Sequence, residues 1–128
     1  MADAQPTVPG LLLVNSKITN PILNEETFIK WYSTEHIPEI LETSGVKSAL
    51  RFQNKDLKAE RPYLVLYPME NIGFLQSDEF KKIGFYSELL PAGAPIYDLT
   101  DMDVRVYSFI DKYEPEGPVK PGMWEPRI

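Results

Sequence analysis

A short apolar run near the N-terminus, Gly10 to Ile18 (GLLLVNSKI), constrains the fold more than any other feature. A helix that crosses a bilayer needs about 20 apolar residues, so this run is too short to span one. Its nearly continuous apolar character is typical of a strand that is covered on both faces. The chain is therefore expected to build a sheet and to bury both of its surfaces.

A helix is predicted after this strand, because Asn20-Pro21 breaks the run and Asn24 can cap the next element. Glu25 and Glu26 then occupy the first turn, where the positive end of the helix dipole favours acidic side chains. Apolar residues continue at helical spacing to Leu41, and Gly45 is expected to stop the helix as its C′ residue.

The rest of the chain predicts three more strands, over residues 46–54, 63–68 and 104–111. A patchily helical region, residues 71–90, separates the last two, and Ser77 is expected to cap a short helix within it. The order βαββαβ is that of a ferredoxin-like α+β fold with an antiparallel four-stranded sheet. Both helices would cover one face, and the apolar residues on the other predict a homodimer that joins two sheets.

The chain has 128 residues, which suits a single domain. We divide it into a leader (1–9), an α+β domain (10–111) and a proline-rich arm (112–128). Pro115, Pro118, Pro121 and Pro126 exclude helix and central strand from the arm. Because the arm also carries Trp124, we expect it to pack on its own domain or on a partner subunit.

Composition excludes several classes of function. A net charge of −6 argues against nucleic acid as a partner, because phosphates require a basic surface. The absence of cysteine excludes disulfides, thiolate nucleophiles and cysteine metal sites. The N-terminus has no signal-peptide pattern and no run is long enough for a membrane span, so we expect a soluble, cytoplasmic protein without a membrane partner.

The single histidine, His36, is the main candidate for chemistry. It lies four residues after Tyr32 and eight after Phe28, so the three share one helix face that should turn toward the sheet. Pro38 cannot donate to the carbonyl of Thr34, which predicts a break in the helix near His36 and space beside it. A core histidine with a satisfied hydrogen bond is the competing interpretation.

Other chemistry has no motif behind it. One histidine cannot build HExxH or a two-histidine facial triad, so no metal is expected. Asp98, Asp101 and Asp103 lack the glycine and terminal glutamate of a calcium loop and are read as solvated loop acids. The glycines form neither GxGxxG nor a phosphate loop, so no cofactor is expected. Arg51 would hold an anion if it points into a pocket, or be solvated if it lies at an edge.

The segment Trp31 to Ile40 (WYSTEHIPEI) resembles the EthD-like branch of the dimeric α+β barrel superfamily, with an aromatic pair followed by Glu-His-x-Pro on the first helix. The resemblance covers about residues 10–111, and the arm lies outside the minimal family pattern. In size the chain is most similar to small proteins of fungal aromatic-polyketide clusters, decarboxylases or dehydratases that act on atrochrysone-carboxylic-acid-type compounds. The resemblance implies a homodimer, no cofactor, and a pocket between helices and sheet with the family's histidine at His36.

We therefore predict a cofactor-free lyase, foremost a decarboxylase of an aromatic polyketide β-keto acid. A protonated His36 would donate to the keto oxygen and stabilise developing negative charge. The predicted substrate-binding residues are Phe28, Tyr32, Arg51, Tyr67, Phe85, Tyr86 and Tyr107, with Arg51 for the carboxylate. Dehydration or aldol-type cyclisation needs the same residues, and a dimer that binds an aromatic metabolite without catalysis is the non-enzymatic alternative.

Overall fold

The computed structural model describes residues 6–119. Its sheet contains β1 (Gly10–Ile18), β2 (Leu50–Gln53), β3 (Tyr63–Met69) and β4 (Thr100–Ser108), in the order β2-β3-β1-β4. All neighbouring strands are antiparallel, so β1 and β2 run parallel with β3 between them. This is the split βαβ arrangement predicted from the sequence, and it makes the fold α+β and ferredoxin-like in topology.

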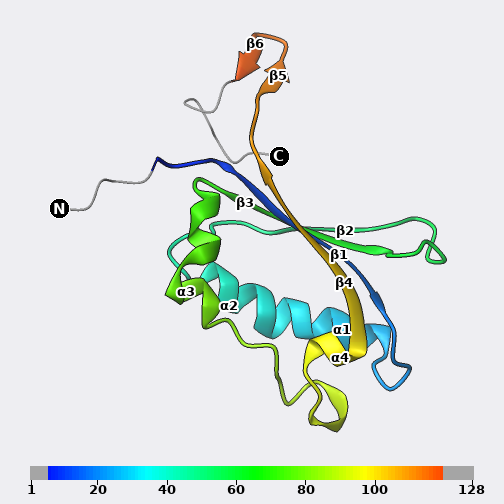
Figure 1. Cartoon of the computed structure of the whole chain (residues 1–128). Helices are drawn as coiled ribbons and strands as arrows, with labels where there is room; N and C mark the ends of the chain where they lie inside the picture. The colour runs from blue at the N-terminus through cyan, green and yellow to red at the C-terminus, as the bar shows by residue number, and fades with distance from the viewer. Residues whose placement is uncertain (1–5, 120–128) are drawn as a thin grey trace.

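The first crossover packs against one face of the sheet (Figure 1). It consists of α1 (Glu25–Trp31), one π-helical turn (Tyr32–His36) and α2 (Ile37–Leu41). Asn24 caps it as predicted, because its Oδ1 accepts a hydrogen bond from the Thr27 N–H at 2.8 Å.

The second crossover returns to β4 through several short pieces instead of one helix (Figure 1). They are η2 (Ile72–Gln76), α3 (Asp78–Lys81), η3 (Pro91–Gly93) and α4 (Ile96–Leu99). Ser77 caps α3 as predicted, with its Oγ accepting from the Phe80 N–H at 3.2 Å. Glycine and proline interrupt the segment at Gly84 and Pro91, which explains why no longer helix forms.

Two predicted strand boundaries are wrong. β2 has only four residues instead of the nine predicted, because its pairing with β3 begins at Leu50. Val46 lies before this strand, where it is buried but pairs with no strand. β4 begins at Thr100 instead of residue 104 and ends three residues earlier than predicted. Of the three acids predicted as loop residues, Asp98 lies in α4, and Asp101 and Asp103 lie in β4. Asp101 pairs with Arg61 at 3.0 Å and Asp103 with Arg105 at 3.0 Å.

Gly45 does not stop the helix. The helix ends at Leu41 with Glu42 as its C-cap, and Gly45 is not among the glycines with positive φ. A Cβ at this position would collide with the Phe74 ring of η2. Glycine is therefore required for the close approach of two segments, not for a left-handed turn.

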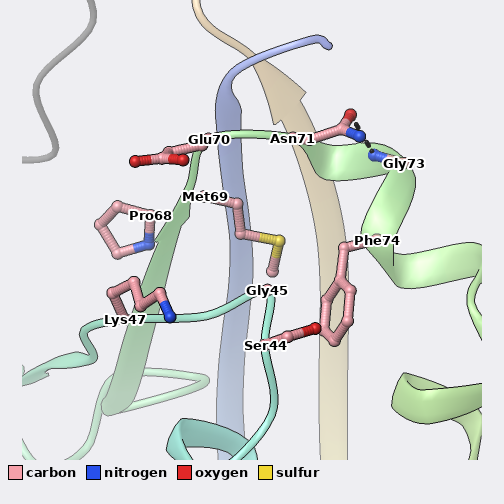
Figure 2. A pocket seen from close by; sticks show the side chains of 9 residues that line it. All are labelled: Ser44, Gly45, Lys47, Pro68, Met69, Glu70, Asn71, Gly73 and Phe74. Atoms are coloured by element: carbon pink, nitrogen blue, oxygen red, sulfur yellow. Dashed lines mark hydrogen bonds between the residues drawn. The ribbon is translucent and has the colours of Figure 1, made fainter. Parts of the chain in front are cut away.

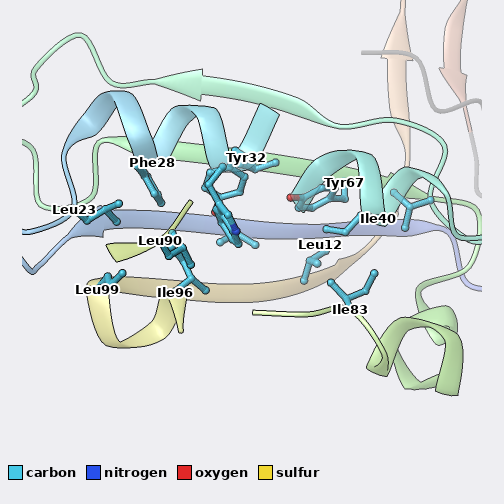
Figure 3. Close-up of a cluster of buried hydrophobic side chains, with 14 of the residues drawn as sticks. Leu12, Leu23, Phe28, Tyr32, Ile40, Tyr67, Ile83, Leu90, Ile96 and Leu99 are labelled. Atoms are coloured by element: carbon cyan, nitrogen blue, oxygen red, sulfur yellow. The ribbon is translucent and has the colours of Figure 1, made fainter. Parts of the chain in front are cut away.

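The core lies between the helices and the sheet (Figure 3). Leu12 and Val14 of β1 and Val65 and Tyr67 of β3 face the helices and are buried. The opposite face of the sheet is bare in the single chain, and it presents Leu11, Leu13, Leu64, Leu66 and Phe52.

The beginning of the predicted arm is a two-stranded hairpin beyond the end of β4, formed by β5 (Lys112–Glu114) and β6 (Gly117–Val119). Pro118 is compatible with β6 because each strand of a two-stranded sheet is an edge strand. Pro121, Trp124 and Pro126 lie outside the described residues. The prediction that the arm packs on its own domain or on a partner subunit also falls on that part of the chain. Between residues 6 and 119, no helix has the length and apolar character that crossing a bilayer requires.

Candidate functional site

A cavity of about 260 Å³ lies between the helix-covered face of the sheet and the second crossover. The sheet contributes Leu12, Val14, Tyr67, Met102, Val104 and Val106 to its wall. The crossovers contribute Tyr32, His36, Ile40, Leu75, Phe80, Phe85 and Tyr97. None of these described wall residues is an aspartate, glutamate, lysine or arginine. The cavity is thus apolar, slightly below the range of about 300–1,000 Å³ typical of ligand sites, and suited to a compact aromatic ligand.

A π-helical turn places His36 on this wall. The Ile37 N–H bonds to the Tyr32 carbonyl, five residues back, where an α-helix would bond four residues back. Pro38 follows directly, and its ring crowds the carbonyl of Thr34 while it offers no N–H. The predicted break near His36 is confirmed, and it takes the form of a widened turn.

The His36 ring is held by aromatic side chains. It stacks on Trp31, with ring centroids 4.4 Å apart and an interplanar angle of 14°, and it meets the Tyr32 ring at 5.6 Å and 76°. Its Nδ1 is buried and has no hydrogen-bond partner among the described residues. Burial lowers the pKa of His36 to about 4, so the ring is neutral near neutral pH. A neutral ring in the free protein differs from the protonated His36 that the sequence analysis predicts as the donor.

Two buried tyrosines, Tyr32 and Tyr67, line the same cavity as His36, and Figure 3 shows both in the buried cluster. The Tyr32 hydroxyl is hydrogen-bonded to the side chain of Ser16, whereas the Tyr67 hydroxyl has no partner in the described part of the chain. Burial raises the pKa of both phenols well above the ordinary value. Both therefore remain protonated and able to donate a hydrogen bond at any physiological pH.

Four of the predicted site residues come together in this cavity: His36, Tyr32, Tyr67 and Phe85. Phe85 packs against Tyr97 with ring centroids 4.9 Å apart, and Tyr97 is half-exposed. Whether these residues bind a substrate stays a prediction, but the geometry required for it is present.

Phe28 and Arg51 lie in a different place. Phe28 is fully buried and lines a groove of about 180 Å³ beside β2, together with Arg51. The Arg51 guanidinium is 5.5 Å from the centroid of the Tyr32 ring and donates to the Ser33 Oγ at 2.7 Å. Arg51 does face the helices, but β2 is the edge strand farthest from β4, so it is not on the wall of the cavity that holds His36.

Tyr86 and Tyr107 are also absent from the cavity wall. Tyr86 is 72% exposed, because its segment lies on the surface of the second crossover. Tyr107 pairs with Leu11 on the bare face of the sheet and is hydrogen-bonded to Arg105. Its neighbour Val106 faces the cavity instead, since successive strand residues point to opposite faces.

The residues that the sequence analysis missed come mainly from β4 and from the second crossover. Met102, Val104 and Val106 alternate with charged or aromatic residues in β4, and this alternation is a visible signal. Tyr97 follows a proline-rich loop and carries no such signal, so only the folded structure brings it to the site.

A larger hollow of about 350 Å³ lies at the end of β3, between the α2–β2 loop and η2 (Figure 2). Lys47, Glu70, Asn71 and Phe74 are among its lining residues, and the Asn71 side chain accepts from the Gly73 N–H at 3.0 Å. None of the predicted site residues lies there, and the Asn71 side chain caps η2 by accepting from a backbone N–H group. We therefore place the candidate site at His36.

The fold and the cavity define an α+β protein with a ferredoxin-like sheet and a single histidine on an apolar, aromatic wall. The sequence is 31% identical over 74 residues to core atranone cluster (CAC) protein 1 of the fungus Stachybotrys chlorohalonatus. The aligned region covers 58% of this chain and 32% of the relative, so the chain matches about a third of that protein. No model of a protein family matches the sequence, and no solved structure matches it either.

Proposed function

We propose that this chain is a tailoring enzyme of secondary metabolism that removes CO₂ from an aromatic polyketide β-keto acid. The observation that carries the proposal is the position of His36 on an apolar cavity wall on which no described residue has a formal charge near neutral pH. The similarity to a protein named for an atranone cluster supports the metabolic setting.

The reaction uses what the cavity provides. The bond between the α-carbon and the carboxyl carbon breaks, CO₂ leaves, and the electron pair moves onto the keto oxygen as an enolate. A hydrogen bond from His36 to that oxygen stabilises the developing charge, a contribution that is typically large when water is excluded. The α-carbon then takes a proton from water. The apolar wall offers the carboxylate no charged partner, which favours its conversion to neutral CO₂.

A second candidate is dehydration or aldol-type cyclisation of a similar polyketide. The Tyr67 hydroxyl favours it, because this buried phenol on the cavity wall has no described partner and can donate a hydrogen bond to the departing oxygen. The mass of the product separates the two reactions.

The bare face of the sheet supports the proposal of a homodimer. In register across β2, β3 and β1 lie Leu50, Leu66 and Leu13, and the row ends at Arg105 of β4. Pairing of two such faces would cover the leucines and leave the charged edge in solvent. A dimeric α+β barrel is the arrangement that we propose.

The test is incubation with a panel of aromatic polyketide carboxylic acids, followed by mass spectrometry. We expect a product lighter by CO₂, or by water for the second candidate. His36→Ala should abolish turnover, while Tyr86→Ala, which changes an exposed aromatic outside the cavity, should not. Full activity in His36→Ala would refute the mechanism, and bound but unchanged ligand would favour a binding protein.

A further inference from the structure

We propose that Trp31 is a positioning residue that holds His36 as a neutral hydrogen-bond donor, with its Nε2–H directed to an oxygen atom of the ligand. This inference specifies the form in which His36 acts at the proposed site. It concerns the free protein as much as the working enzyme, so it can be tested without a substrate.

The orientation of His36 is set by stacking and not by a hydrogen bond. Functional histidines are commonly oriented by a bond from Nδ1 to a carboxylate or a carbonyl. Here Nδ1 is buried and no described residue bonds to it. The nearly parallel Trp31 ring, itself only 2% exposed, fixes the plane of the imidazole from one side, and the Tyr32 ring meets it edge-on.

The π-helical turn makes this stack possible. In an α-helix, residues five apart point about 140° away from each other, because each residue turns the chain by about 100°. Trp31 and His36 are five apart, and the π-turn between them widens the helix so that its hydrogen bonds span five residues. The two rings are thereby brought onto one side of the helix, at a centroid distance of 4.4 Å.

Burial of Nδ1 also selects the tautomer. A neutral imidazole carries its proton on one nitrogen only. Buried N–H groups without an acceptor are rare in proteins, since they lose their bonds to water and gain none in return. Nδ1 is the ring nitrogen that is buried without a partner, and Nε2 is not. The proton of His36 therefore belongs on Nε2.

The ligand class follows from this assignment. A neutral N–H donor on a wall without formal charge recognises an oxygen with an available lone pair, such as a ketone that becomes an enolate. The Tyr67 phenol, protonated at all relevant pH values, is a second donor on the same wall. The cavity is thus suited to oxygen acceptors on an aromatic ring system.

The experiment is ¹⁵N NMR of the imidazole, which is simple because His36 is the only histidine in the chain. We expect a single Nε2–H tautomer in the wild type, with titration only well below the ordinary pKa. Trp31→Leu should produce a mixture of tautomers and at least a tenfold larger protonated fraction at mildly acidic pH. Trp31→Phe retains a stacking ring and should resemble the wild type, which keeps the test valid if Trp31→Leu does not fold.

Phe28→Leu is the matched control, because Phe28 is equally buried and packs on Tyr32 without a ring contact to His36. It should leave the tautomer and the titration unchanged. An Nδ1–H tautomer in the wild type, or an unaltered titration in Trp31→Leu, would overturn the inference. Turnover measured on the same variants is separate: failure of all substrates would refute the proposed function and leave the tautomer result standing.

Discussion

Acid should destabilise this protein through His36, whose ring is buried as a neutral group. Burial lowers the pKa of the folded ring to about 4, whereas an unfolded chain has the ordinary value of 6.5. As the pH falls below the unfolded value, the unfolded chain binds a proton that the folded chain cannot bind. The free energy of unfolding therefore decreases as the pH falls through this window and is unaffected by His36 above it.

The size of the effect follows from the two pKa values. One pKa unit corresponds to about 1.4 kcal/mol, so the full loss approaches about 3 kcal/mol below the folded pKa. At about pH 5 the calculated loss is about 2 kcal/mol, a large fraction of the stability of a small domain.

The assay is urea unfolding at about pH 7 and about pH 5 for the wild type and for His36→Gln, which cannot titrate. Other groups contribute equally to both proteins, so the difference between their pH dependences isolates the ring. We expect the wild type to lose about 2 kcal/mol more than the variant between these pH values. Equal losses in both proteins would show that the ring is not buried as a neutral group.

Two further changes test the surroundings of the site. Tyr67→Phe removes a buried hydroxyl without a described partner, so thermal melting should show unchanged or higher stability, by up to about 1 kcal/mol, and a clear loss would reveal a hidden bond. Leu66→Glu places a charge between Leu13 and Leu50 on the bare sheet face, so light scattering should report a monomer. A dimer that survives this change does not use the sheet face.

The sequence predicted those elements whose signals are local. Asn24 caps the first helix and the first strand spans its predicted residues, because a capping side chain and an apolar run act over a few neighbouring positions. The break beside His36 was also predictable, since Pro38 removes a specific backbone donor. The π-turn that results was not, because its register depends on how Trp31 and Tyr32 pack on the sheet.

Site residues on strands were harder to predict, for two separate reasons. Tyr107 was placed on the wrong face by one residue, and a shift of one residue in a strand exchanges the two faces completely. Arg51 was placed on the correct face, but it lies outside the cavity wall, because strand order decides which neighbours share a site. Strand order is a long-range property that no local pattern contains.

In the second crossover, the residues that line the cavity are different from the residues that are buried in the core. Leu75, Phe80, Phe85 and Tyr97 shape one side of the cavity from short pieces of this crossover. Ile83, Leu90, Ile96 and Leu99 of the same crossover are buried in the core and anchor it to the sheet and the first helix. Mutations at the four cavity positions can change the chemical preference of the site while the buried residues keep the crossover in place. Duplicated copies of such a gene would diversify most readily at these cavity positions. Each copy would bind a different ligand next to the same imidazole.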